Sequence, residues 1–392
     1  MDATREAQPL LPLGGQCTVT RSPVASASPV RGHLLSFESG FPSLVDEDEF
    51  RDLESKQTDR ASKQWTALSV LLTLLMSAIG SGTLSVPYTL LLLSPTQAVI
   101  TILLVGLAMA FTADVILRVH VAVVLSAQHE EVRETYQELA YHAGGHRLAR
   151  VVSFLAGFAV FGACVGCVRV VKDMAPSLVS MVYLRRDQSF DSLPTDEQDV
   201  LVLRTVWIVF MAVVLPLGFF KKISVLRYSS YLGFMFCLYL VGAVAYRSIV
   251  GAPVDSQHHP DPLPIQIGES FFSKLSVAIG IYNFTYMLHL NVIPLFPQAI
   301  TSIPKLRQDT LRAAESRMSL YIYAAIAICA ALYSVFGVCA ASIYGQLTQG
   351  NILLNLTHDS IMAVPRVMIL FTILFSFPLL FHPLRCLVLE MQ

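Results

Sequence analysis

The sequence predicts an all-α membrane protein, on the basis of its composition and the spacing of its apolar residues. Of 392 residues, 54% are hydrophobic and only 14% are charged, against about 25% charged in an ordinary soluble domain. The apolar residues gather into nearly uncharged blocks of about 20, the length a helix needs to cross a bilayer. A net charge of -1 provides no basic face for nucleic acid. The lipid bilayer is therefore the predicted surrounding.

Residues 1–64 are predicted to form a disordered cytosolic tail, because they are polar, rich in Ser and Pro, and lack a sustained apolar period. No cleavable signal peptide is expected, since Met1 begins a charged stretch without an apolar core. Glu6 stands four residues before Leu10 and Leu11. This spacing resembles an acidic dileucine signal for sorting adaptors, and a chance match explains it equally well.

Residues 65–392 are predicted to form the transmembrane domain, with about eight spans. The blocks cover residues 65–93, 96–125, 150–184, 200–219, 225–250, 271–295, 318–344 and 364–389. Residues 130–146 predict a short amphipathic cytosolic helix. Lys and Arg gather in loops on the side of the N-terminus, which is therefore predicted to be cytosolic. The Asn355 sequon then lies in a lumenal loop and is an expected glycosylation site.

The first span contains Gly80-Ser81-Gly82-Thr83, which predicts a break in the helix. A break at membrane depth survives only where it lines a cavity or holds a ligand. Free amide groups there would suit a substrate carboxylate, and the carbonyls around Ser77 and Ala78 would suit a cation or an amino group. The alternative is that the two glycines only allow close helix packing.

The sixth span is polar and aromatic at depth, with Asn283, Phe284 and Thr285 followed by His289, Asn291 and Pro294. We expect this helix to be interrupted as well. Breaks in the first and sixth spans, five helices apart, are what an inverted repeat places around a central site. His289 would either carry a proton or hydrogen-bond the broken backbone.

The remaining charged residues and cysteines within the spans are expected to have structural rather than catalytic roles. Asp114 and Arg118, and likewise Arg169 and Asp173, are four residues apart and are expected to form structural ion pairs. Cys164 and Cys167 are expected to pack between helices rather than bind metal. The sequence contains no H-E-x-x-H, G-x-S-x-G or P-loop motif, so no enzyme activity is predicted.

Together these residues resemble the amino acid/auxin permease family, close to the solute carrier family 38 neutral amino acid transporters. The likeness begins near Gln64 and rests on short motifs whose order and spacing are specific. These are Ala78 to Tyr88, Tyr136 to Ala140, Gly162 to Cys164 with Asp173 and Pro176, Leu215 to Leu217, Leu226 to Ser230, His289 to Pro294, and Pro378 with His382 to Arg385.

The resemblance implies a LeuT-like inverted-repeat bundle of the APC superfamily that works by alternating access. Substrate would lie between the broken helices, and a cation would lie between the first and eighth, where Thr372 and Ser376 offer hydroxyls. Sodium-coupled members have an Asn where this chain has Met76, so Na+, H+ and exchange all stay open. The family has eleven spans, so a second repeat left incomplete after the eighth is expected.

We therefore predict a secondary transporter, a symporter of amino acids coupled to a cation or proton, with no other cofactor. The alternative is a sensor that binds amino acids without moving them. The predicted location is the plasma membrane or an acidic, lysosome-like organelle. Eight residues are expected to contact substrate: Gly80, Ser81, Gly82, Thr83, Asn283, Phe284, Thr285 and His289. The cation would bind Ser77, Ala78, Thr372 and Ser376.

Overall fold

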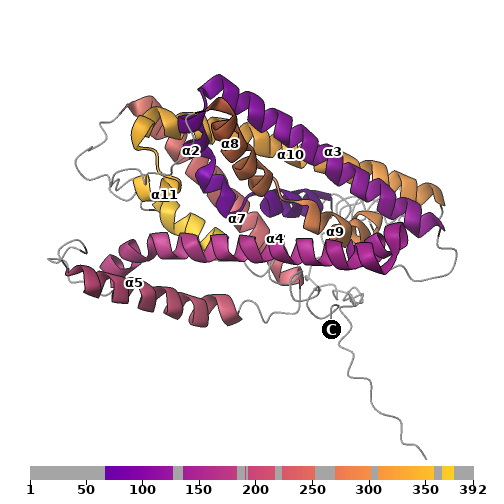
Figure 1. The fold of residues 1–392 in the computed structure, drawn as a ribbon, viewed down its shortest axis with the longest axis horizontal. Coiled ribbons are helices and arrows are strands. Elements are labelled where there is room, and N and C mark those ends of the chain that lie inside the picture. Colours follow the sequence, from indigo (N-terminus) through magenta and orange to yellow (C-terminus); the bar gives the residue numbers. More distant parts are fainter. Residues whose placement is uncertain are drawn as a thin grey trace, which may run out of the picture. The chain divides into compact units, whose positions relative to one another are not determined.

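A computed structural model describes residues 67–126, 136–182, 190, 193–216, 223–251, 270–301, 308–356 and 364–374. Within these ranges the chain is helical apart from turns and short connections, and no strand occurs in them (Figure 1). This confirms the predicted all-α class. The tail with Glu6, Leu10 and Leu11 lies outside the described residues, and so does Ser376.

The long helices follow the predicted spans closely. They are α3 (Pro95–Ser126), α4 (Tyr136–Val182), α5 (Thr195–Val209) with its π-helical continuation η3 (Phe210–Val214), α7 (Ile223–Val250) and α10 (Gln308–Tyr344). α10 begins ten residues before the predicted block, because its first turns are polar and extend beyond the apolar stretch. The last predicted span is described only as the helix Val364–Leu374.

The shorter elements lie at the two predicted breaks and in one loop. They are the helix Ala67–Ala78, η1 (Ser81–Ser85), α2 (Val86–Leu92), α8 (Phe271–Thr285), α9 (His289–Thr301), η5 (Gly345–Leu347) and α11 (Ile352–Asn355). By length and composition, four described helices are able to cross a membrane, or five when the bent pair Ala67–Ala78 and Ser81–Leu92 is taken as one. The predicted sixth span is divided into α8 and α9.

α4 is not one straight rod. Its backbone leaves the helical region at Gly144 and Gly145, and Gly145 adopts a positive φ of 70°, a conformation that glycine reaches without steric cost. The segment before this bend corresponds to the short helix predicted ahead of the third span. Tyr136, near its start, donates a hydrogen bond to the carbonyl oxygen of His289 at the start of α9.

The broken helices pack against α3, α4 and α10, which contact η1, α2 and α8 in different combinations (Figure 1). A Cβ placed on Gly106 of α3 would lie 3.3 Å from both Ile326 and Tyr286, so a small residue lets α3 approach its neighbours. The side of α3 that faces away from the other helices is apolar. Leu104 and Phe111 on this side are 63% and 60% exposed. Such a surface suits contact with lipid.

Candidate functional site

The first helix is interrupted where the glycine motif predicts. The segments on either side, Ala67–Ala78 and Ser81–Leu92, are bent by 49°. Gly80 is extended, with φ -123° and ψ -160°. Among the described residues, the N–H groups of Ser81 and Gly82 donate no recorded backbone hydrogen bond. Buried amides need a partner, so these two groups are available to an acceptor from outside the chain.

The second interruption separates α8 from α9. Tyr286, Met287 and Leu288 are not helical, and the amide of Leu288 turns back to the carbonyl of Tyr286 at 2.8 Å. The helix resumes at His289. Both broken spans that the sequence predicts are therefore present.

The two breaks touch each other at Gly82. A Cβ built on this residue would lie 2.7 Å from Cδ1 of Phe284 and 2.8 Å from Oγ1 of Thr285. Both distances are shorter than any ordinary carbon contact, so only glycine fits without movement of its neighbours. Gly82 thus allows the unwound part of the first span to lie directly against the end of α8.

A cavity lies at this junction and contains about 530 Å³ of empty space, including its open side. Six residues predicted to bind substrate or cation line the cavity: Ser77, Ala78, Gly80, Ser81, Gly82 and Phe284. The structure therefore brings together the unwound backbone of the first span and one aromatic side chain from α8.

The remaining predicted substrate residues lie elsewhere. Thr83 is buried but does not line the cavity. Asn283 is exposed on another side of α8. The hydroxyl of Thr285 donates to the carbonyl of Ile281 at 2.7 Å. The ring of His289 lies 2.8 Å from the hydroxyl of Thr112 on α3, so this histidine joins helices rather than facing the cavity.

Six further lining residues were not among the predicted contacts: Met76, Ala163, Cys167, Met287, Asn291 and Ile373. Ala163 and Cys167 are four residues apart on α4, so one helical face fronts the break. That spacing is visible in the sequence, but a helical stripe of small residues also occurs at ordinary packing contacts. The sequence places Asn291 in the polar part of the sixth span but does not indicate which group it contacts.

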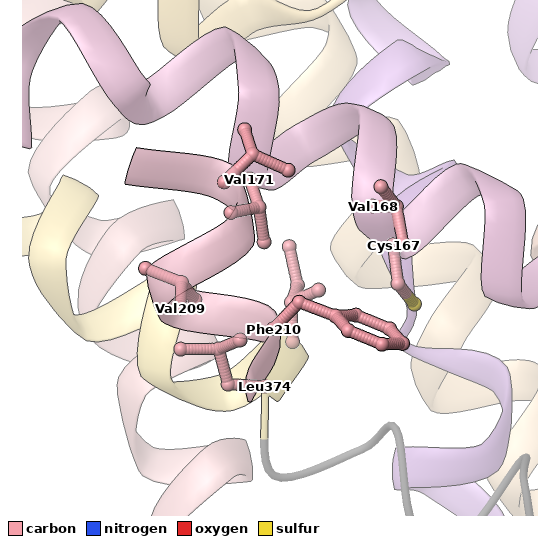
Figure 2. A pocket seen from close by; sticks show the side chains of 8 residues that line it. Cys167, Val168, Val171, Val209, Phe210 and Leu374 are labelled. Atoms are coloured by element: carbon pink, nitrogen blue, oxygen red, sulfur yellow. The ribbon is translucent and has the colours of Figure 1, made fainter. Parts of the chain in front are cut away.

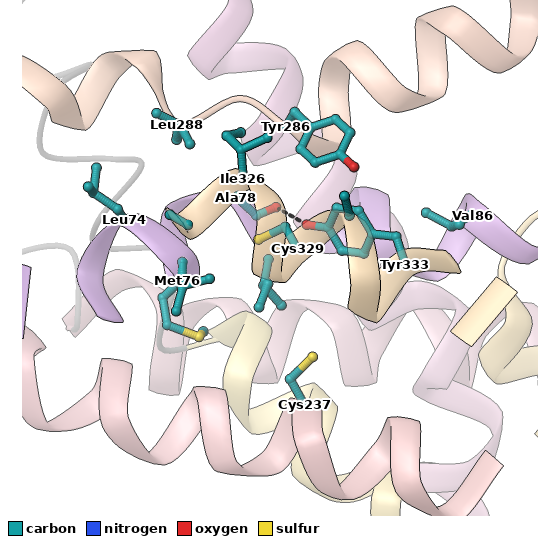
Figure 3. Close-up of a cluster of buried hydrophobic side chains, with 14 of the residues drawn as sticks. Leu74, Met76, Ala78, Val86, Cys237, Tyr286, Leu288, Ile326, Cys329 and Tyr333 are labelled. Atoms are coloured by element: carbon teal, nitrogen blue, oxygen red, sulfur yellow. Dashed lines mark hydrogen bonds between the residues drawn. The ribbon is translucent and has the colours of Figure 1, made fainter. Parts of the chain in front are cut away.

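The three predicted cation residues that the structure describes, Ser77, Ala78 and Thr372, have protein partners. The hydroxyl of Tyr333 on α10 donates to the carbonyl oxygen of Ala78 at 3.0 Å (Figure 3). Thr372 donates its hydroxyl to the carbonyl of Met368 at 3.0 Å. A Cβ placed on Gly233 of α7 would meet both Thr372 and Met76, at 3.1 Å and 2.7 Å. The thioether of Met76 therefore lies in the region where the resemblance implies a cation.

A second, apolar pocket lies between α4, α5 with η3, and the helix Val364–Leu374 (Figure 2). It is lined by Cys167, Val168, Val171, Val206, Val209, Phe210, Ile373 and Leu374. None of these side chains is charged, so the pocket has nothing to bind the charged ends of an amino acid. Cys167 and Ile373 also line the larger cavity and form a shared wall.

The predicted ion pairs are present but lie outside the cavity. Arg118 contacts Asp114 at 2.8 Å, and Arg169 contacts Asp173 at 3.1 Å. The second pair is extended by Asn351, whose amide donates to Asp173 at 3.0 Å. Each ion pair lies within one helix, as the four-residue spacing in the sequence predicts, and only Asn351 connects the second pair to another segment.

Asn355 does not have the exposure that glycosylation requires. It is 1% exposed, its amide nitrogen donates to the carbonyl of Leu347 at 2.7 Å, and its amide oxygen accepts from the N–H of Gln349 at 2.8 Å. Attachment of a glycan to the folded protein would break these contacts. Long-range packing therefore covers a side chain that looks accessible in sequence, and glycosylation at Asn355 stays a prediction.

The fold defines a helical membrane protein in which a cavity lies where two discontinuous helices meet. A family model described as transmembrane amino acid transporter protein matches residues 63–391. The chain belongs to this family, as its sequence motifs indicated. The family consists of transporters, in agreement with the prediction that the chain is not an enzyme.

Individual relatives are distant and longer than this chain. The chain is 28% identical to vacuolar amino acid transporter 5 of Schizosaccharomyces pombe over 60% of its own length and 50% of the relative. It is 25% identical to sodium-coupled neutral amino acid transporter 7 of Xenopus laevis, over 78% of the chain and 62% of the relative. For vacuolar amino acid transporter 5 of Saccharomyces cerevisiae the identity is 22%, over 81% and 65%. The chain thus spans half to two thirds of these proteins. No solved structure gives a significant match.

Proposed function

We propose that the chain moves amino acids across a membrane as a secondary transporter. One observation carries this proposal: two broken helices meet at Gly82 around a cavity lined by unwound backbone. Discontinuous helices of this kind form substrate sites in several transporter folds. Family membership and the names of the relatives support transport over the alternative, a sensor that binds without moving its ligand.

The substrate's carboxylate would accept hydrogen bonds from the N–H groups of Ser81 and Gly82, which have no recorded backbone acceptor. Its side chain would lie against Phe284 and the thioether of Met287, two apolar groups that line the cavity. Among the described residues that line it, none is charged. This lining favours amino acids with uncharged side chains, since a buried charge without a partner is costly.

Alternating access would use the breaks as hinges, in a LeuT-like bundle with inverted repeats. Each broken span consists of two short helical arms joined by a few residues that are not helical. An arm on one side of the cavity would tilt while its counterpart stays packed. The contact between Gly82 and Phe284 would keep the two hinges together during this movement.

Coupling to a proton, or exchange, fits the described residues better than coupling to sodium. A hard cation such as Na+ prefers oxygen ligands, whereas Met76 offers a weakly binding thioether. The carbonyl oxygen of Ala78 already accepts two hydrogen bonds, from the hydroxyl of Tyr333 and from the N–H of Gly80, each at 3.0 Å. We therefore expect uptake to continue when sodium is replaced by choline and to increase with an inward proton gradient.

Counterflow tests the transport proposal directly. Purified protein in lipid vesicles preloaded with an unlabelled amino acid should accumulate the labelled form from outside. Gly82→Val should abolish accumulation, because its larger side chain enters the space of Phe284 and Thr285. Binding without exchange in the wild-type vesicles would favour the sensor instead.

We also propose an organelle membrane as the location, with the N-terminus in the cytosol. Two of the three relatives described above are named as vacuolar. A fluorescent fusion should coincide with a lysosomal or vacuolar marker. If Leu10 and Leu11 form a sorting signal, replacing both by Ala should move the fusion to the cell surface.

A further inference from the structure

The side chains of Ser77 and Asn291 form a hydrogen-bonded pair that joins the two broken spans. The hydroxyl of Ser77 donates to the carbonyl oxygen of Thr73 at 2.8 Å. The amide nitrogen of Asn291 lies 2.8 Å from the same hydroxyl oxygen. A serine hydroxyl has a single proton, and here Thr73 receives it. Ser77 must therefore accept from Asn291, and this fixes which end of the amide faces Ser77.

The other end of that amide is a carbonyl oxygen, Oδ1, with two lone pairs. Among the described residues, no hydrogen bond to Oδ1 of Asn291 is recorded. Asn291 and Ser77 both line the cavity and are half-buried. An acceptor oxygen held in a fixed orientation beside a cavity is suited to a ligand that carries N–H groups.

We propose that Oδ1 of Asn291 accepts a hydrogen bond from the protonated amino group of the substrate. This inference rests on the proposed function. It adds a contact for the substrate's amino group to the proposed contacts for its carboxylate. The unwound first span presents N–H donors for the carboxylate, whereas the carbonyl of Ala78 is already bonded to Tyr333. An acceptor for the amino group then comes from the second broken span, through Asn291.

The position of the pair also connects binding to the hinges. Ser77 is near the end of the first helix, one residue before its last, and Asn291 is in the first turn of α9. The hydrogen bond between Ser77 and Asn291 already connects the two broken spans. A substrate bound to Asn291 and to the amides of Ser81 and Gly82 would form a second connection between them. Ser77 is a positioning residue here, because it orients the amide of Asn291 and does not itself accept a hydrogen bond from the substrate.

The test compares an amino acid with an analogue that lacks only the amino group. The probes are L-leucine and 4-methylpentanoate, which share the carboxylate and the side chain. Binding is measured by competition with labelled leucine on the purified chain in detergent. Asn291→Leu should weaken leucine binding by about ten- to a hundred-fold, since a hydrogen bond to a charged group is lost. It should leave the apparent affinity for 4-methylpentanoate unchanged, measured by direct equilibrium dialysis.

Four further variants sharpen this comparison. Asn291→Asp keeps an acceptor oxygen but loses the N–H that donates to Ser77, so it should bind leucine more tightly than Asn291→Leu does. Asn283→Leu makes the same substitution on α8, outside the cavity, and should bind both compounds as the wild type does. Ser77→Ala should weaken leucine binding by a smaller factor, and Ser77→Thr should restore it by returning the hydroxyl.

Three results would overturn the assignment of Oδ1 alone, and a fourth would overturn the proposed function as well. Asn291→Leu would have only a structural effect if it weakened leucine and 4-methylpentanoate equally. A loss seen with sodium present but not with choline would assign Oδ1 to a coupling cation. Unchanged leucine affinity in Asn291→Leu would exclude the proposed hydrogen bond to the amino group, and the transport proposal would still stand. If the wild-type protein bound none of the twenty common amino acids, the proposed function itself would fail, and the inference with it.

Discussion

The hydroxyl of Tyr333 donates a hydrogen bond to the carbonyl oxygen of Ala78, across 255 positions of sequence. Ala78 is the last residue of the first helix, so its carbonyl has lost its helical partner at the break. Tyr333 is 1% exposed and supplies a buried donor from α10. The same carbonyl also accepts from the N–H of Gly80 at 3.0 Å, so Tyr333 supplies a second donor to a buried group that has no partner within its helix.

Replacing Tyr333 by Phe should destabilise the protein by about 0.5–1.5 kcal/mol, because the buried carbonyl of Ala78 loses one of its two donors and keeps the N–H of Gly80. The expected result is a lower midpoint of thermal unfolding in detergent, measured by the fluorescence of a thiol-reactive dye. Tyr323→Phe is the matched control, since Tyr323 lies on the same helix and is 36% exposed. Equal midpoints for wild type and Tyr333→Phe would contradict the assigned role of this hydroxyl.

The contact between Gly82 and Phe284 can be tested by a double substitution. Gly82→Ala places a methyl group 2.7 Å from the ring of Phe284, so uptake should fall strongly. Adding Phe284→Ala removes the ring and should recover part of the protein's thermal stability, although Thr285 remains close. Gly162→Ala is the control, because nothing lies within 4 Å of its Cβ position.

Additive effects of Gly82→Ala and Phe284→Ala on the unfolding midpoint would indicate that the two residues do not interact. A recovery larger than the uncertainty of the midpoint would support direct contact between the two breaks.

The ion pair of Asp114 and Arg118 predicts unequal effects of its two single substitutions. The Asp114 side chain is 4% exposed and that of Arg118 is 63% exposed. Arg118→Ala leaves a buried carboxylate without its cation and should reduce the amount of folded protein recovered from membranes. Asp114→Asn removes the buried charge and should be milder, and the double variant should recover most of the yield. Size-exclusion chromatography measures the folded fraction, and equal losses in both single variants would exclude this explanation.

The burial of Asn355 predicts that the folded protein carries no glycan at this position. Treatment with a peptide glycosidase should leave its electrophoretic mobility unchanged after expression in a eukaryotic cell. Asn355→Asp should destabilise the protein by about 1–3 kcal/mol, because the carbonyl of Leu347 loses its amide donor. A glycosidase-sensitive band that disappears in Asn355→Gln would show that the loop is exposed in cells.

Local chemistry made both breaks predictable, because glycines or polar groups interrupt an apolar helix in a recognisable way. What could not be predicted was which side chains turn toward the cavity. Asn283 and Asn291 look alike in sequence, but they lie on opposite sides of the interruption, and only Asn291 lines the cavity. The roles of Tyr333 and Asn355 depend on partners brought close by packing, and neither residue has a local signal for them.

α10 holds both arms of the first broken span. Tyr333 is bonded to Ala78 before the break, and a Cβ on Gly337, one turn further along, would meet Leu90 at 2.8 Å and Val86 at 3.3 Å after it. α10 therefore connects the two arms on either side of the break. The 49° bend cannot change while both attachments persist, so any rocking of one arm has to carry α10 along or release it at Tyr333 or at Gly337.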